Sequence, residues 1–155
     1  MTKYAEGTEV PISRSRDELE RTLERFGATA QAWLRDDEKE TVVLAFKRAG
    51  KGYKLVVRLV DAAACALTPK GNERTASAAQ DAADQENRRR FRSLANYVKA
   101  VMDAADTGII SAEDALLPYL MLPSGETVAQ AIQEQMKLAP GAVDLSRSLG
   151  GGKSA

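Results

Sequence analysis

The amino-acid sequence predicts an α+β fold: an N-terminal helix on a three-stranded antiparallel meander, followed by a long helix and two short helices. Three observations support this prediction. Helix-capping residues and helical apolar spacing mark the first segment, strand-like alternation between short turns marks the second, and a long apolar stripe marks the third. The 155 residues are enough for one domain with a sizeable core. We assign that domain to residues 1–137 and expect a disordered Gly-rich tail over 138–155.

The first helix is expected over residues 16–26. Ser15 and Glu18 have the spacing of a capping box, in which the serine oxygen accepts from the third helical amide and the glutamate bonds back to the serine amide. Apolar residues recur at helical spacing over 19–26, and Gly27 stands where a helix can end in a left-handed conformation.

Three strands are expected at residues 28–34, 41–47 and 53–60, joined by turns over 35–40 and 49–52. In the third strand the side chains alternate between two faces. One face carries Tyr53, Leu55, Val57 and Leu59, and the other carries Lys54, Val56, Arg58 and Val60. The alternation predicts that Tyr53 belongs to the buried face of the sheet.

The second half of the chain reads as helical. A long helix is expected over residues 77–105, and its core stripe consists of Phe91, Leu94, Ala95, Val98, Val101, Met102 and Ala105. Ser111 is the expected cap of a short helix, limited by Pro118. Thr127 and Gln130 form a second capping box, which opens a helix over 128–137.

The composition argues against several chemistries. The chain contains no histidine and one cysteine, Cys65. Histidine-based zinc sites, serine–histidine triads and internal disulfides are therefore excluded. The acidic turn at Asp36–Asp37–Glu38 lacks calcium-loop spacing and reads as solvated. We expect a protein that is not an enzyme, with no metal ion and no cofactor.

The cellular location is predicted from the same features. No apolar run reaches the roughly 20 residues that a membrane span needs, and the N-terminal residues lack the apolar core of a signal peptide. A lone cysteine also fits a reducing compartment. The expectation is a cytoplasmic protein with no membrane partner.

The charge is segregated along the chain although the net charge is zero. Residues 41–99 carry twelve basic and five acidic side chains, whereas residues 100–136 carry six acidic and no basic ones. Such asymmetry is a hint of nucleic-acid contact. The alternative is that folding brings the two segments together and cancels their charges.

The first functional hypothesis is sequence-independent binding of nucleic acid through a basic hairpin and an arginine-rich helix. The candidate contacts are Lys47, Arg48, Lys51, Lys54, Arg89, Arg92 and Lys99. Arg88 and Arg90 are expected to matter less, because Asp84 and Glu86 precede them by four residues and can pair with them. Arg89 and Arg92 have no acidic residue at that spacing.

The alternative hypothesis is a protein-binding inhibitor or adaptor of a host or phage enzyme that acts through the acidic segment 103–134. Its candidate contacts are Asp103, Asp106, Glu113, Asp114 and Tyr119. The apolar run over 116–123 offers a patch for such a partner or for a homo-oligomer. Burial of that run in the core is the competing interpretation.

Two stretches carry a resemblance to a known group of proteins. They are VPISRSRDELERTLERFGA, followed by a Trp-bearing strand, and RRRFRSLANYVKAVMDAADTGI with the downstream LPYLMLPSGETVAQAI. With these two stretches, the chain resembles, over roughly residues 10–136, a family of small uncharacterised α+β accessory proteins encoded by tailed phages and prophages. The resemblance implies an accessory role beside phage DNA metabolism or host takeover, in the cytoplasm of a bacterial host cell. Its motifs are structural, so it implies no catalytic residue.

Overall fold

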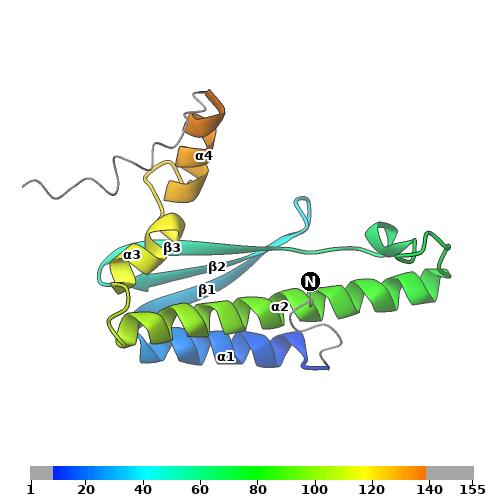
Figure 1. Cartoon of the computed structure of the whole chain (residues 1–155), viewed down its shortest axis with the longest axis horizontal. Helices are drawn as coiled ribbons and strands as arrows, with labels where there is room; N and C mark the ends of the chain where they lie inside the picture. The colour runs from blue at the N-terminus through cyan, green and yellow to red at the C-terminus, as the bar shows by residue number, and fades with distance from the viewer. Residues whose placement is uncertain (1–8, 139–155) are drawn as a thin grey trace, which may run out of the picture.

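The computed structural model describes residues 9–138 and confirms the α+β class (Figure 1). Helix α1 (Ile12–Arg25) precedes three strands, β1 (Ala28–Asp36), β2 (Thr41–Arg48) and β3 (Lys51–Arg58). A 3-10 turn, η1 (Ala63–Cys65), leads into the long helix α2 (Ala76–Asp106). The described chain ends with α3 (Ala112–Leu116), η2 (Leu117–Tyr119) and α4 (Val128–Leu138). The predicted tail beyond residue 138 lies outside the described residues.

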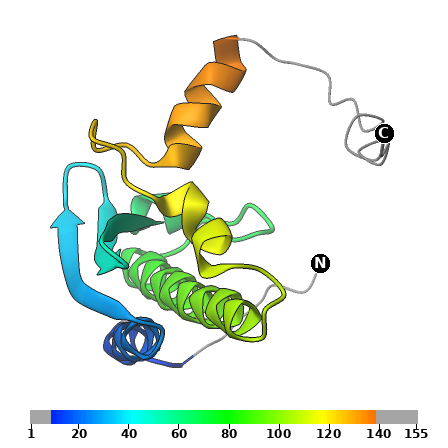
Figure 2. The same cartoon turned by 90° about the vertical axis from the view of Figure 1, so that its left-hand side faces the viewer.

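The strands form an antiparallel sheet of order β1-β2-β3, and α1 and α2 lie side by side along one of its faces (Figures 1 and 2). The core between these layers consists of Leu19, Leu23, Leu44, Phe46, Tyr53, Leu55, Ala95, Val98, Met102 and Leu116. The predicted burial of Tyr53 is confirmed, since only 2% of it is exposed. Burying each large apolar side chain contributes about 1.5–3 kcal/mol, so this layer holds the fold together.

The prediction that Ser15 caps the first helix is wrong. The helix begins at Ile12, after Pro11, whose φ of −60° and ψ of 149° direct the chain into it. Ser15 is buried within the helix, and its hydroxyl has no hydrogen-bond partner among the described residues. The earlier start is favoured because Ile12 packs against the buried cluster of Val42, Val57 and Phe91.

The turn between β2 and β3 is tighter than predicted. Arg48 pairs directly with Lys51, which leaves Ala49 and Gly50 as a two-residue turn with φ angles of 49° and 74°. Two positive φ angles are typical of a type I′ hairpin turn, whose twist matches that of the strands. The third strand therefore begins at Lys51, two residues before the predicted start.

The other predicted helix ends agree closely with the structure. Gly27 ends α1 with a φ of 93°. The Ser111 hydroxyl accepts from the Asp114 amide at 3.0 Å, and Thr127 and Gln130 form the predicted capping box. Helix α2 begins one residue early because Thr75 caps it, accepting from the Ala78 amide at 3.2 Å. None of the helices in residues 9–138 is long and apolar enough to cross a membrane.

Candidate functional site

The basic hairpin is partly neutralised by the second half of the chain. Arg48 donates from Nη1 to Glu113 Oε1 at 3.1 Å and from Nε to the Phe26 carbonyl at 2.9 Å. Lys54 Nζ donates to the Gly125 carbonyl at 2.7 Å. Lys47 and Lys51 are exposed near the turn. Two of the four predicted hairpin cations are therefore committed to contacts within the chain.

The arginines of α2 are also held by neighbours. Arg89 donates two hydrogen bonds to Glu86, at 2.7 and 2.6 Å, and Arg90 donates to Glu86 at 3.0 Å. The bonds from Arg89, with those from Arg90, lower the pKa of Glu86 to about 2, although partial burial opposes the shift. Arg92 forms an ion pair with Glu18 of α1.

The expected pairing along this helix is therefore only half right. The pair of Arg90 with Glu86 is confirmed. The expected pair of Arg88 with Asp84 is wrong, because Arg88 donates to Gln85 Oε1 and Asp84 accepts from Gln80. Arg89 and Arg92 have no acidic residue four positions before them, but both are paired. Arg89 pairs with Glu86, three positions before it, and Arg92 pairs with Glu18 of α1.

The arginine cluster of α2 and the hairpin turn lie near opposite ends of β3. Arg90 Nη1 donates to the carbonyl of Arg58, which anchors the arginine cluster of α2 to the far end of β3. Lys51 begins that strand, seven residues away, and at about 3.3 Å per residue this separation is about 23 Å. Lys99 is exposed two turns further along α2 than Arg92. The predicted contacts on the hairpin and on α2 are thus spread along the length of β3.

Three of the five candidate contacts of the acidic segment 103–134 are also held by partners within the chain. Asp103 pairs with Arg25 at 3.4 Å, Glu113 pairs with Arg48, and the Tyr119 hydroxyl shares a 2.7 Å hydrogen bond with that of Tyr97. Burial, with this bond, raises the pKa of Tyr119. Asp106 and Asp114 are exposed. Folding thus brings the acidic and basic segments together.

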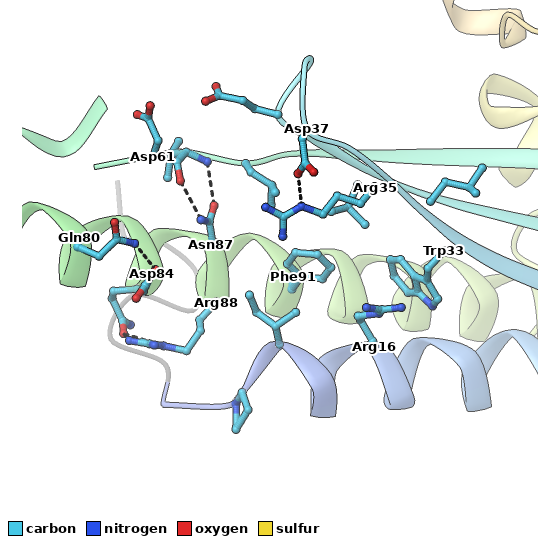
Figure 3. Close-up of a pocket in the computed structure, with 18 of the residues that line it drawn as sticks. Arg16, Trp33, Arg35, Asp37, Asp61, Gln80, Asp84, Asn87, Arg88 and Phe91 are labelled. Carbon is cyan, nitrogen blue, oxygen red and sulfur yellow. Dashed lines mark hydrogen bonds and ion pairs between the residues drawn. The ribbon is translucent and has the colours of Figure 1, made fainter. Parts of the chain in front are cut away.

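A cleft of about 940 Å³ opens between the start of α1, the N-terminal half of α2 and the adjoining ends of the strands (Figure 3). Its apolar lining includes Ile12, Trp33, Val42, Leu59 and Phe91. The ring centroids of Trp33 and Phe91 lie 6.0 Å apart with a 38° tilt, a separation at which aromatic rings attract. The rim is formed by exposed polar residues, so the cleft is open to solvent.

The Trp33 ring is fixed in place by two polar contacts. Its Nε1 donates to Glu20 Oε1 at 2.6 Å, and the Arg16 guanidinium lies 4.5 Å from the ring centroid. A cation at this distance is attracted to the ring. The aromatic part of the floor is therefore preorganised before any ligand enters.

The rim of the cleft carries more acidic than basic side chains. Five acidic residues, Glu9, Asp37, Glu40, Asp61 and Asp84, stand against three arginines, Arg16, Arg35 and Arg88. Asp61 and Asp84 lie at the same end of the cleft (Figure 3). Within residues 9–138 neither of these two carboxylates has a basic side chain at ion-pair distance. Arg88 lies at the same end but donates to Gln85, so two carboxylates stand against one arginine there (Figure 3).

Asn87 fixes the acidic end of the cleft to α2. The Val60 amide donates to Asn87 Oδ1, and Asn87 Nδ2 donates to the Val60 carbonyl, both at 2.9 Å. The side-chain amide thus pairs with the chain after β3 as a neighbouring strand would. Asp61 follows directly and accepts the Ala64 amide at 2.8 Å, so its carboxylate is held at the rim.

The groups that line the cleft are suited to binding. Aromatic and aliphatic side chains offer an apolar anchor site, and the carboxylates offer a place for a cation. The described residues contain no cluster of three or more histidine, cysteine or acidic side chains able to hold a metal ion. Cys65 is half-buried and does not line the cleft.

Sequence reasoning identified Trp33 only as a strand residue and did not identify Asp61 or Asp84 as site residues. The cleft joins residues from four segments that are distant in the sequence, so no local spacing predicts it. The one available signal was that Trp33 is the only tryptophan in the chain.

Comparison with known proteins adds no family assignment. No protein-family model, no curated protein and no solved structure matches this chain.

Proposed function

We propose that this protein is a non-enzymatic protein-binding module, an adaptor or inhibitor, that receives a short segment of its partner in the cleft between α1, α2 and the sheet. The observation that carries the proposal is the pairing of an aromatic floor, Trp33 with Phe91, and an acidic end formed by Asp61 and Asp84. An apolar side chain of the partner packs on the rings, and a basic side chain next to it pairs with the carboxylates.

The shape of the cleft favours a protein segment as the ligand. A volume of about 940 Å³ is at the upper end of the range for sites that enclose a small molecule. This cleft is open along its exposed rim, so it can accept several consecutive side chains while the rest of the partner stays outside. Protein interfaces with an apolar centre and a polar rim have this organisation.

The charges of the rim favour a basic segment. Arg35 is paired with Asp37, and Arg16 lies over the Trp33 ring, so these cations already have partners. Asp61 and Asp84 accept hydrogen bonds from the Ala64 amide and from Gln80, but neither has an ion-pair partner among residues 9–138. Such complementarity mainly sets the choice of partner and the association rate. The expected ligand is therefore apolar at one position and basic at the adjacent positions.

Nucleic-acid binding has weaker support from the geometry. A phosphate backbone needs several unpaired cations along one surface, whereas Arg48, Arg89 and Arg92 are paired with carboxylates of the same chain. Tyr53, the aromatic residue of the hairpin, is buried and stacks on Phe46 with a centroid distance of 5.2 Å. It is thus not available to stack on a base.

The test uses dye-labelled peptides and fluorescence anisotropy at low and moderate salt. The probe alternates lysine with leucine, and its matched control has glutamate in place of each lysine. Binding of the lysine peptide, with little binding of the glutamate peptide or of a labelled single-stranded oligonucleotide, supports the proposal. Preference for the oligonucleotide or for the glutamate peptide contradicts it.

Two double variants locate the binding site. Asp61→Asn/Asp84→Asn retains the hydrogen-bond acceptors and removes both charges, and it should weaken binding of the lysine peptide about three- to tenfold at low salt. Asp17→Asn/Asp106→Asn removes two exposed charges outside the cleft lining and should leave the affinity within about twofold of wild type. Equal weakening by the two variants would show that the peptide responds to net charge and not to the cleft.

A further inference from the structure

In the described part of the chain, no layer covers the face of the sheet that points away from α1 and α2, and this face carries an aliphatic row. Leu34, Val43 and Val56 stand opposite one another on the three strands, with Ala32 and Ala45 in the next row. Leu34 is 60% exposed and Val56 is 46% exposed. The solvent face of an antiparallel sheet is usually polar, so a continuous aliphatic row across all three strands indicates a surface that another layer covers.

Helix α4 presents the complementary feature. It packs chiefly against η2 and projects away from the α1–α2 layer (Figures 1 and 2). Ile132 and Met136, one turn apart on this helix, are 49% and 63% exposed. An amphipathic helix is normally stabilised by burying its apolar stripe, but in the described chain this stripe has no layer opposite it.

Backbone hydrogen bonds fix the start of α4 beside the edge of β3. The segment that runs from α3 to the end of α4, residues 112–138, is called the arm. The Met121 amide donates to the Gly52 carbonyl at 2.9 Å, which joins the arm to the edge of β3. The Val128 amide donates to the Leu120 carbonyl at 3.0 Å, and the Thr127–Gln130 capping box fixes the first turn. In this arrangement the main contact of α4 is with η2 and not with any strand, so α4 does not cover its own sheet.

The length of α4 matches the width of the open face. Its 11 residues span about 16 Å, and three strands spaced about 4.8 Å apart present a face roughly 14 Å wide. The rim of the face is basic, with Lys47, Lys54 and Arg58 on the same side of the sheet as Val56. Helix α4 contains one acidic residue, Glu134, and it pairs with Lys137 of the same helix, so apolar contact and not charge would hold α4 on this face.

We infer that two copies of the chain associate by exchanging arms, so that α4 of each lies across the open sheet face of the other. Within residues 9–138, each copy has an uncovered aliphatic row on its sheet and an uncovered apolar stripe on α4, so a reciprocal pair satisfies both in two equivalent interfaces. Such a closed two-fold arrangement is the commonest form of homo-oligomer, and exchange of an identical element is a low-cost route to it. The interface shares Leu34 with the lining of the cleft but does not include Asp61, Asp84, Trp33 or Phe91.

Disulfide trapping between two differently substituted proteins tests the exchange. In a Cys65→Ser background, which removes the only cysteine, one protein carries Val56→Cys and the other Ile132→Cys. Both positions are exposed, so the substitutions leave the fold intact, which circular dichroism verifies. Mixing and mild oxidation should give a disulfide-linked pair containing one of each protein, and the unsubstituted protein should sediment with twice the mass of one chain.

The controls make each outcome informative. Leu67→Cys, an equally exposed apolar position in the loop before α2, should not link to Ile132→Cys. A disulfide of Val56→Cys with itself would indicate sheets packed face to face and would overturn arm exchange. A disulfide formed only within one chain of the Val56→Cys/Ile132→Cys double variant would show that α4 covers its own sheet. A protein that sediments as a single chain and gives no linked pair also rules the proposal out.

Discussion

Arg48 and Glu113 join the basic hairpin to the acidic segment. Their side chains approach to 3.1 Å across 65 residues of sequence, and the same guanidinium also bonds the Phe26 carbonyl at the end of α1. The hydrogen bond from its own backbone amide, with the bond from Arg48, lowers the pKa of Glu113. One ion pair thus joins the basic segment 41–99 to the acidic segment 100–136.

Replacing Arg48 should be costly although it lies near a surface turn. Its side chain is 22% exposed, and Arg48→Ala leaves the Phe26 carbonyl without its donor. We expect the free energy of unfolding to fall by about 1–3 kcal/mol, the usual range for losing hydrogen bonds that involve a charged group. The neighbouring Lys47→Ala, at an exposed position, should change it by less than about 0.5 kcal/mol. Urea denaturation measures both, and equal effects would contradict the structural role of Arg48.

Core truncation should follow the burial of each side chain. Leu44 is fully buried between the sheet and the helices, so Leu44→Ala should cost about 2–5 kcal/mol. Leu94, which the sequence places in the core stripe, is only half-buried, so Leu94→Ala should cost less. Leu67→Ala, in an exposed loop position, should be nearly neutral. Thermal melting gives the ranking, and a larger loss for Leu94 than for Leu44 would be inconsistent with the packing described above.

The turn between β2 and β3 should be improved by one substitution. Ala49 has a φ of 49°, a left-handed conformation that costs a residue with a Cβ roughly 1–2 kcal/mol. Asparagine tolerates this conformation better and is favoured before glycine in such turns. Ala49→Asn should therefore raise the free energy of unfolding by up to about 1 kcal/mol. A decrease would mean that the turn is not of the two-residue type.

The stability contributed by Glu86 should depend on pH. Its pKa falls from 4.5 in the unfolded chain to about 2 in the fold, mainly because Arg89 donates to the carboxylate. A lowered pKa stabilises the fold above the unfolded value, and this contribution is lost as the pH falls from about 4.5 to about 2. Glu86→Gln should be less stable than wild type by about 1–2 kcal/mol at pH 6, and the gap should close by pH 2.

Urea titrations of the two proteins at pH 6, 4 and 2.5 measure this gap. Asp81→Asn, an exposed acidic position on the same helix, is the control and should show a small, nearly constant difference. A gap between wild type and Glu86→Gln that stays constant across this range would exclude Glu86 as a stabilising ion-pair residue.

Local patterns explain why most of the fold could be predicted. Ser111 and Thr127 act as caps because the amides that they satisfy are within three residues, and Tyr53 is buried because strand side chains alternate. Ser15 failed as a cap because packing of Ile12 against Phe91 extends the helix past it. A contact between distant segments thus outweighed a local signal.

The candidate site depends on such distant contacts throughout. Arg92 is occupied by Glu18, which lies 74 residues away, and Asp61 and Asp84 come together only when Asn87 ties the chain after β3 to α2. A sequence pattern reports neighbours within a few residues. For that reason the sequence identifies the basic residues but does not predict which distant acidic residues pair with them.

The fluorescence of Trp33 tests the central proposal most directly, because the only tryptophan of the chain forms part of the floor of the cleft. Titration with the unlabelled lysine–leucine peptide should change its emission intensity and wavelength with saturation. Asp61→Asn/Asp84→Asn should shift the midpoint to higher peptide concentration. The glutamate–leucine peptide and a single-stranded oligonucleotide should leave the emission unchanged. An unchanged spectrum with the lysine–leucine peptide, at concentrations where anisotropy reports binding, would contradict the account, because the peptide would then occupy a surface other than the cleft.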